Sequence, residues 1–260
     1  MLFANGDSFT YGDELGGSRN DPPTHWHNTF PKILSNKLGV KNTVNIASCG
    51  ASNQKIFRTT CNFIERHHKK MDYCVIMWSS WGRLEVCEPF TLESDTSIFI
   101  KQAENMNSII PDHRSGRFEF NAKSEERPKR KAAIQSWYDE VYTLQTAITH
   151  HLGYMRHIQF LCDTFDIKCI QGVIHPGNWQ NLLYTIKQCN NTHDWDQYKQ
   201  NVMKHLNSLR PECRMGLGHY KSVHEIACDR KGGILKGGHI DKQGHHDFAS
   251  LIYNIIKGIV

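Results

Sequence analysis

The feature that most constrains the fold of this chain is a series of four short apolar runs. Stretches with helical spacing lie between these runs and after the last of them. Apolar runs of roughly four to eight residues between turn signals have the length of buried strands. The third run is apolar throughout, which is typical of a central parallel strand covered on both faces. Strands that alternate with helices form a doubly wound sheet, so the sequence predicts a three-layer α/β/α sandwich with a mostly parallel sheet. The runs lie at 1–4, 44–48, 73–78 and 167–174.

We predict a single domain over residues 1–260. A chain of this length can bury a real core. From about 86 to 130 the pattern dissolves into polar residues with isolated aromatics. We interpret this stretch as an insertion, either a lid or a small subdomain with some structure of its own. Residues of about 177–236 are expected to hold irregular additions. Helices are predicted at 26–38, 53–64, 131–165, 179–188, 195–209 and 248–256.

The charge of the chain argues against a nucleic-acid partner. Its formal net charge of +5 arises from 31 basic and 26 acidic residues spread along the sequence, which is too small an excess for a nucleic-acid-binding protein. The densest basic cluster, at 127–131, is expected to be a solvated helix start. No apolar stretch approaches the length of a membrane span, so no membrane partner is predicted.

The nine cysteines are scattered, and no two are spaced as Cys-x-x-Cys. An odd number of cysteines, several of them inside apolar segments, indicates reduced and mostly buried thiols, and hence a reducing compartment. The chain opens directly into the first predicted strand, without a basic leader. We therefore expect a cytoplasmic protein.

The first motif that carries chemistry follows the first strand, in Gly6-Asp7-Ser8-Phe9-Thr10-Tyr11-Gly12. Gly6 and Gly12 allow backbone angles and close approaches that a Cβ would block. A hydroxyl between such glycines, just past the end of a strand, is well placed to act as a nucleophile. Gly-Asp-Ser turns also occur without any catalytic role, so the motif alone does not identify Ser8 as a nucleophile. Partner residues are needed for that conclusion.

The candidate base lies near the other end of the chain, at His239, just before the last predicted helix. Sites in parallel sheets gather at the carboxyl ends of the strands, and Ser8, Gly50 and His175 each follow a predicted strand. A serine hydroxyl needs such a base to become a nucleophile. These side chains are therefore expected to meet at one rim of the sheet.

The two motifs resemble the first and last sequence blocks of the GDSL/SGNH hydrolases. Gly6, Asp7, Ser8 and Gly12 match the first block. In the last block the catalytic histidine is followed by a loop, a Gly-His pair and a closing amphipathic helix, and His239 is followed by all three. The resemblance covers the core strands and both catalytic termini, and it implies the SGNH-type, flavodoxin-like form of the α/β/α sandwich.

The same resemblance implies a role for individual residues. Ser8 would be the nucleophile and His239 the base, and the backbone N–H groups of Ser8 and Gly50 would form an oxyanion hole. The family takes a third oxyanion donor from an asparagine after the third strand, where this chain has Trp81. Replacement donors for that position are Asn53, Ser79 and Ser80.

A second departure from the family concerns the acid that orients the histidine. The family places an aspartate two or three residues before the histidine, where this chain has Lys236 and Gly237. A backbone carbonyl, Asp229 or Asp241 could take its part, although Asp241 is also a natural N-cap for the last helix. An orienting acid fixes the histidine tautomer, so its identity bears on how well Ser8 is activated.

The substrate is expected to lie against residues at the same rim of the sheet. Aromatic and arginine side chains suit the recognition of sugars or carboxylates, and we predict that Asp7, Trp81, Arg83 and His175 bind substrate. The alternatives to substrate binding are that an aromatic side chain packs in the core and that Arg83 forms a surface ion pair with Glu85.

The sequence as a whole predicts a serine esterase without a cofactor or metal, acting on a short-chain ester, for example an acetyl ester, of a carbohydrate or other small molecule. One alternative is a catalytically weak binding protein that kept the fold and lost the acid and the asparagine. Another is a metal-dependent hydrolase that uses His239, Asp241, His245 and His246 as ligands, although their spacing fits no structural zinc pattern. The oligomeric state is not predicted.

Overall fold

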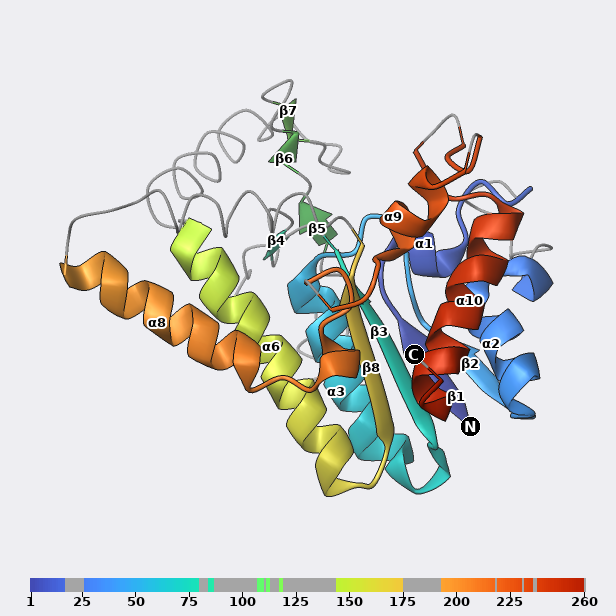
Figure 1. The fold of residues 1–260 in the computed structure, drawn as a ribbon, viewed down its shortest axis with the longest axis horizontal. Helices are drawn as coiled ribbons and strands as arrows, with labels where there is room; N and C mark the ends of the chain where they lie inside the picture. Colours follow the sequence, from blue (N-terminus) through green and yellow to red (C-terminus); the bar gives the residue numbers. More distant parts are fainter. Residues whose placement is uncertain are drawn as a thin grey trace, which may run out of the picture.

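Four parallel strands form the central sheet of the computed structural model, in the order β2-β1-β3-β8 (Figure 1). They are β1 (Leu2–Asn5), β2 (Thr43–Asn45), β3 (Tyr73–Trp78) and β8 (Lys168–Val173). Every pairing in this sheet is parallel, which confirms the predicted strand arrangement. The structure describes residues 1–16, 26–79, 84–86, 107–109, 111–112, 117–118, 144–174, 193–217, 219–230, 232–235 and 238–259.

Helices cover both faces of the sheet, which confirms the three-layer α/β/α sandwich (Figure 1). Helices α2 (Phe30–Leu38) and α10 (Lys242–Lys257) lie on one face, and α3 (Asn53–His67) and α6 (Leu144–Thr164) lie on the other. Successive side chains of a strand point to opposite faces. Because helices cover both faces of the sheet, the side chains of β3 are buried on both sides. Its sequence is therefore apolar without interruption.

The helix ends follow from local sequence. The Ser52 hydroxyl caps α3 by accepting a hydrogen bond from the Lys55 N–H at 3.2 Å. The Asp241 carboxylate caps α10 through the Gly244 N–H at 2.7 Å. Such caps satisfy N–H groups that have no partner inside the helix.

Some elements differ from the prediction. Helix α9 (Val223–Cys228) forms within a stretch that had no clear pattern, because a capping box between Ser222 and Glu225 starts a helix too short to show periodicity. The serine turn after β1 is itself a short helix, α1 (Ser8–Tyr11). Helix α8 spans His193–Asn207, close to its predicted place. Short 3-10 helices lie at Trp26–Asn28, His68–Lys70 and Pro211–Cys213.

The predicted insertion lies largely outside the described residues. Two antiparallel strand pairs are described at its start and within it. They are β4 (Leu84–Val86) with β5 (Asn107–Ile109), and β6 (Pro111–Asp112) with β7 (Arg117–Phe118). The predicted helix at 179–188 and the start of the one at 131–165 also lie outside the described residues.

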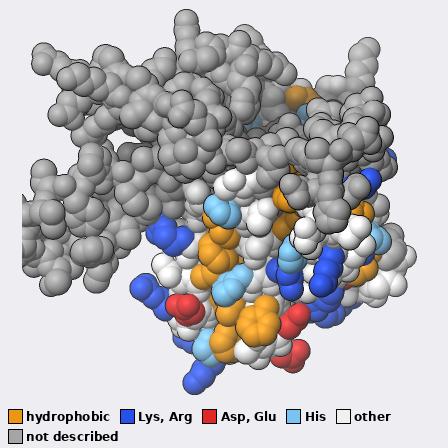
Figure 2. All heavy atoms as spheres, turned by 90° about the vertical axis from the view of Figure 1, so that its left-hand side faces the viewer, with side chains coloured by type: hydrophobic (Ala, Val, Ile, Leu, Met, Phe, Trp, Pro, Cys, Tyr) orange, Lys and Arg blue, Asp and Glu red, His pale blue; other side chains and the backbone are white. Residues whose placement is uncertain are grey.

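The outer surface of the described residues mixes apolar and histidine side chains on one face (Figure 2). Between α3 and α6, Phe57 stacks on Tyr154 at 4.5 Å between ring centroids, and His157 meets the same phenyl ring edge-on at 5.4 Å. Phe160, further along α6, is 65% exposed. None of the helices in the described part of the chain is both long enough and apolar enough to cross a membrane.

Candidate active site

The turn after β1 holds Ser8 at the carboxyl end of the sheet. A Cβ on Gly6 would lie 2.8 Å from the carbonyl oxygen of Met77, so only glycine lets this turn pack against the end of β3. The Asp7 carboxylate caps α1 by accepting a hydrogen bond from the Phe9 N–H at 3.1 Å. Gly12 ends the helix with a left-handed φ of 89°. Ser8 is thereby fixed as the first residue of α1.

His239 lies next to this serine, although 231 residues separate them in sequence. Its Nε2 is 2.8 Å from the Ser8 Oγ, within hydrogen-bond distance. The loop of His239 is tied down on both sides, because its carbonyl accepts a hydrogen bond from the Leu235 N–H at 2.7 Å and the next residue, Ile240, is buried. The Phe9 ring lies 5.0 Å from the imidazole, between centroids. The structure thus brings the two predicted catalytic residues together.

The second imidazole nitrogen faces Glu14, which the sequence analysis did not single out. The Glu14 Oε2 lies 2.9 Å from the His239 Nδ1 and also accepts a hydrogen bond from the His239 backbone N–H at 3.4 Å. A carboxylate can only accept, so Nδ1 carries a proton and Nε2 is left to accept the Ser8 hydroxyl proton. Glu14, His239 and Ser8 therefore form a continuous hydrogen-bonded chain.

Glu14 reaches the imidazole from an unusual backbone conformation. Its φ is +67°, in the left-handed region that costs a residue with a Cβ roughly 1–2 kcal/mol. The preceding turn is fixed, because the Gly12 and Asp13 N–H groups both donate to the Ser8 carbonyl, at 2.9 and 3.0 Å. Strained residues of this kind cluster at functional sites. The Asp13 carboxylate lies further away, 3.9 Å from the His239 Nε2.

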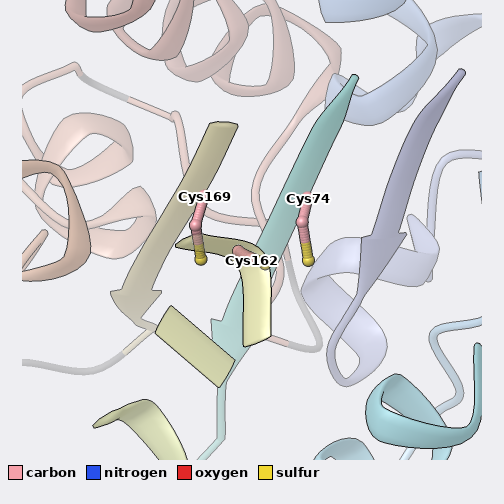
Figure 3. A group of neighbouring side chains, drawn as sticks. All are labelled: Cys74, Cys162 and Cys169. Carbon is pink, nitrogen blue, oxygen red and sulfur yellow. The ribbon is translucent and has the colours of Figure 1, made fainter. Parts of the chain in front are cut away.

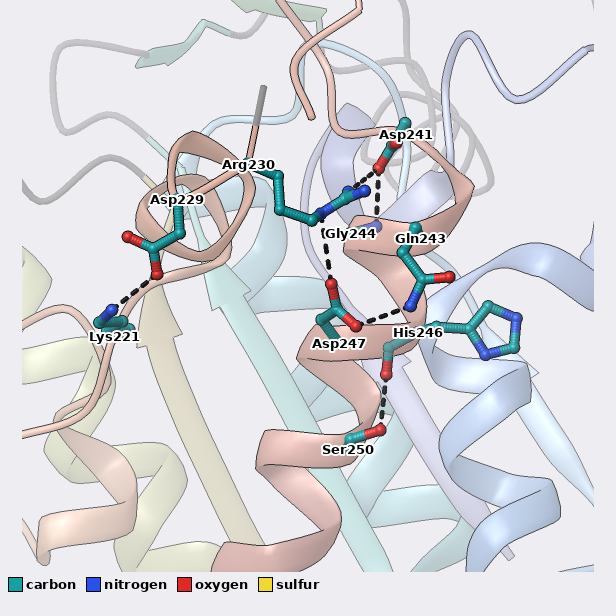
Figure 4. A network of polar contacts seen from close by, with 9 residues as sticks. All are labelled: Lys221, Asp229, Arg230, Asp241, Gln243, Gly244, His246, Asp247 and Ser250. Carbon is teal, nitrogen blue, oxygen red and sulfur yellow. Dashed lines mark hydrogen bonds and ion pairs between the residues drawn. The ribbon is translucent and has the colours of Figure 1, made fainter. Parts of the chain in front are cut away.

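The two aspartates considered as the orienting acid are engaged elsewhere (Figure 4). Asp229 pairs with Lys221 at 2.6 Å. Asp241 caps α10 and pairs with Arg230. Partial burial raises the pKa of Asp241, but the hydrogen bonds from Arg230 and from the Gly244 N–H outweigh it and hold the pKa below its ordinary value. The carboxylate that lies beside the His239 Nδ1 is that of Glu14.

A buried polar network supports the serine turn from below. The Ser79 hydroxyl, at the end of β3, donates to the Asp7 Oδ2 at 2.8 Å. The Ser79 N–H donates to the Asn53 Oδ1 at 2.8 Å, and the Asn53 Nδ2 donates back to the Ser79 carbonyl at 3.1 Å. Asp7 is only 1% exposed, and its carboxylate holds the turn. Its predicted part in substrate binding stays a prediction that this burial does not favour.

The network ends at His151, in the first half of α6. The Asn53 Nδ2 lies 2.9 Å from the His151 Nδ1, which must accept the hydrogen bond because an amide nitrogen can only donate. Burial lowers the pKa of His151 to about 3, so the imidazole stays neutral in the folded protein. Both amide hydrogens of Asn53 are thus directed at protein acceptors, and its predicted part as an oxyanion donor stays a prediction that these contacts do not favour.

Gly50 lies in the loop after β2, which runs beside the serine turn. The Ser48 N–H donates to the Gly6 carbonyl at 3.2 Å and ties the two loops together. Gly50 itself has a φ of 75°, in the left-handed region. Its part in an oxyanion hole stays a prediction. The other predicted site residues, Ser80, Trp81, Arg83 and His175, lie outside the described residues.

The histidines near the C-terminus do not converge on a metal site. His245 is buried on α10, and its Nδ1 accepts a hydrogen bond from the Phe30 N–H at 3.1 Å. The His246 side chain projects from α10 on the side away from Arg230 (Figure 4). His239 is bound to Ser8 and Glu14, and Asp241 to Arg230. The predicted metal-dependent alternative has no ligand set among these residues.

Comparisons with known proteins found similar chains only among solved structures, and at low identity. No protein-family model matches the sequence, and no curated protein matches it either. Among solved structures, the chain is similar to a G-D-S-L family lipolytic protein from Desulfitobacterium hafniense, with 12% identity, a TM-score of 0.47 and 98% of each chain covered. A G-D-S-L family protein from Veillonella parvula shares 11% identity over 98% of this chain and 96% of its own, with a TM-score of 0.41. A lipase from a goat rumen metagenome shares 13% over 96% and 95%, with a TM-score of 0.42.

These likenesses are distant, so the fold and the site rest on other observations. The fold is defined by the order and direction of the strands, and the site by the distances between Ser8, His239 and Glu14.

Proposed function

We propose that this protein is a serine ester hydrolase that works through an acyl-enzyme. One observation carries the proposal: the hydrogen-bonded chain from the Glu14 carboxylate through His239 to the Ser8 hydroxyl, with distances of 2.9 and 2.8 Å. A nucleophile, a base within hydrogen-bond reach and a third group that orients the base are what covalent acyl transfer requires. Ser8 is 6% exposed and the His239 side chain is 14% exposed, so the pair is largely shielded from solvent but still accessible.

In the first half of the reaction the Ser8 Oγ attacks the carbonyl carbon of the ester. The His239 Nε2 takes the hydroxyl proton as the Oγ–C bond forms, and Glu14 stabilises the imidazolium through Nδ1. The intermediate collapses when the C–O bond to the leaving group breaks, and His239 gives its proton to that oxygen. The products are an alcohol and an acylated Ser8.

In the second half, water repeats the same chemistry. His239 takes a proton from the water as its oxygen bonds to the acyl carbon, and it returns that proton to the Ser8 Oγ when the acyl group leaves as an acid. The negative charge on the carbonyl oxygen needs N–H donors in both halves. The Ser8 N–H is available in the first turn of α1, where N–H groups have no acceptor inside the helix, and the Gly50 N–H is the proposed second donor.

The substrate is proposed as a short-chain ester, for example an acetyl ester of a carbohydrate or another small molecule. This part of the proposal rests on the sequence resemblance alone, and fold analogy is a weak guide to substrate. The competing idea of a catalytically weak binding protein assumed that the orienting acid had been lost. Glu14 removes that reason for preferring it.

Labelling with a fluorophosphonate probe tests the proposal, because such probes react with an activated serine hydroxyl. We expect the folded wild-type protein to be labelled, Ser8→Ala to be silent and His239→Ala to be labelled slowly. The matched control is Ser250→Ala, which removes a serine hydroxyl on α10 that donates to the His246 carbonyl at 2.8 Å. It should be labelled like the wild type.

A second measurement follows the reaction itself. Hydrolysis of nitrophenyl acetate should exceed that of longer acyl chains and should disappear in Ser8→Ala. The esterase proposal is ruled out if the folded wild-type protein neither takes the probe nor hydrolyses any of these esters. That result would favour the binding protein.

A further inference from the structure

Three buried thiols meet at the amino end of the sheet, the end opposite Ser8. Cys74 on β3 and Cys169 on β8 are direct partners in the parallel register, so their side chains point to the same face (Figure 3). Cys162, in the last turn of α6, reaches this face from the helix that covers it. The three sulfur atoms all lie within 4.8 Å of one another. Each residue is at most 1% exposed.

We propose that Cys74, Cys162 and Cys169 bind one soft metal cation, either Zn²⁺ or Cu⁺. Thiolates select these ions over Mg²⁺ or Ca²⁺, which prefer oxygen ligands. With a Zn–S bond of about 2.3 Å, two sulfurs on one ion are roughly 4 Å apart. The observed separations therefore need to shrink by less than about 1 Å, which side-chain rotation supplies.

The composition of the cluster favours a ligand set over ordinary packing. Among the described residues, this is the group of three or more His, Cys, Asp or Glu side chains that lie close enough to share an ion. It joins three elements that are distant in sequence, at the one end of the sheet where α6 turns back into β8. Isolated buried cysteines act as small apolar side chains, but that role does not require their sulfur atoms to meet.

The charges around the cluster suit a bound cation. Three thiolates without an ion would be a large uncompensated charge in an apolar interior. A divalent ion reduces the net charge to one negative unit. The Arg210 guanidinium interacts electrostatically with Cys169, and it is held by Asp163 at 3.0 Å and Glu212 at 3.3 Å.

Cys213 is the available fourth thiol. Its Sγ donates to the Cys169 carbonyl at 3.5 Å, so it lies beside the cluster but outside the group of three. Zn²⁺ in structural sites is almost always four-coordinate, whereas a three-sulfur set suits Cu⁺. A role for Cys213 therefore distinguishes the two ions.

The test uses the full chain, purified under reducing conditions and loaded with Zn²⁺ or Cu⁺ in separate samples. Metal retained after desalting is counted per chain, and the ultraviolet thiolate-to-metal absorption is titrated. We expect one equivalent, bound at least about tenfold more weakly in Cys74→Ala, Cys162→Ala and Cys169→Ala. The control is Cys61→Ala, which removes a half-buried thiol of α3 outside the cluster and should bind like the wild type.

Cys213→Ala then identifies the ion: loss of binding supports a four-sulfur Zn²⁺ site, and unchanged binding supports a three-sulfur Cu⁺ site. If an alanine variant does not fold, the wild type alone decides, because a bound ion must raise the thermal unfolding midpoint and a chelator must lower it again. The inference is overturned if the wild type retains no equivalent of either ion, or if the three cluster variants bind as well as Cys61→Ala. Neither outcome depends on esterase activity.

Discussion

The buried side chains at the two ends of β3 and β8 differ in their chemistry. At the carboxyl end, Ser79 and Asn53 are buried polar residues that hydrogen-bond to each other and to the serine turn. At the amino end, Cys74 and Cys169 are buried thiols in direct register. Buried polar groups need partners, whereas thiols can be packed as small apolar groups. The carboxyl end therefore depends on hydrogen-bond geometry that a single substitution can break, whereas the thiols of the amino end need no hydrogen-bond partner and remain available as the proposed metal ligands.

The largest effect is expected from Glu14→Gln at the carboxyl end. Glutamine keeps the size of the side chain but removes the charge that selects the His239 tautomer, so kcat should fall by about 10²- to 10⁴-fold with an unchanged unfolding midpoint. Asp229→Asn is the matched control, because it neutralises the acid of a surface ion pair with Lys221 and should leave kcat unchanged. Equal kcat values for the two variants would refute the role of Glu14.

The next effect concerns acid stability. His151 has a pKa of about 3 in the folded protein against an ordinary value of 6.5, so the unfolded chain binds its proton first as the pH falls. Stability from this group is complete above pH 6.5 and is lost between pH 6.5 and about 3, by roughly 1.4 kcal/mol per pH unit.

Urea unfolding of the wild type and of His151→Gln at pH 7 and pH 4.5 measures this loss. The wild type should lose more stability than the variant, whereas His157→Gln, on the exposed side of the same helix, should lose as much as the wild type. Parallel pH dependence of the wild type and His151→Gln would contradict the expectation.

Ser79→Ala should couple stability to activity. It removes a buried hydrogen bond to the Asp7 carboxylate, which is worth about 1.5–3 kcal/mol, and it loosens the turn that holds Ser8. We expect kcat to fall by about 10- to 100-fold as the nucleophile loses its position. Ser35→Ala, which removes a buried hydroxyl that donates to the Val40 carbonyl at 3.0 Å, should lower stability alone. A fall in kcat in both variants would show a general effect of destabilisation.

The smallest effect compares two residues with left-handed backbones, one at each end of the sheet. Glu14 has a φ of 67°, and Asp166, in the turn between α6 and β8, has a φ of 54°. Glu14→Gly should raise the free energy of unfolding by about 0.5–1 kcal/mol while activity is lost. Asp166→Gly should change it by less than about 0.5 kcal/mol with activity intact, because aspartate tolerates this region better than glutamate. Chemical denaturation of both variants, with activity measured in parallel, checks the pair.

The sequence predicted the parts of the molecule that depend on local pattern. Strand β3 was recognisable because both of its faces are buried, and α3 because Ser52 caps an amphipathic stretch. The pairing of Ser8 with His239 was predictable from the resemblance, in which a serine follows the first strand and a histidine precedes the closing helix. Helix α9 escaped prediction because it has fewer than two turns.

Other features of the site could not be read from the sequence. Glu14 lies 225 residues from its partner, and nothing in its surroundings distinguishes it from another loop carboxylate except its closeness to the serine motif. Asn53 was considered as an oxyanion donor in place of the asparagine that the family has after the third strand. Its contacts with Ser79 and His151 depend on how α6 packs, which local pattern does not reveal.

The distance in sequence between Ser8 and His239 also bears on when the protein acquires its chemistry. Ser8 is synthesised 231 residues before His239, its proposed base. Until the loop of His239 docks beside α1, the serine has no proton acceptor and is an ordinary alcohol. Because closing so long a loop costs entropy that only the packed sheet and helices repay, catalytic competence arises together with the tertiary structure. Under the proposed function, a nascent or partly unfolded chain is therefore unreactive toward esters.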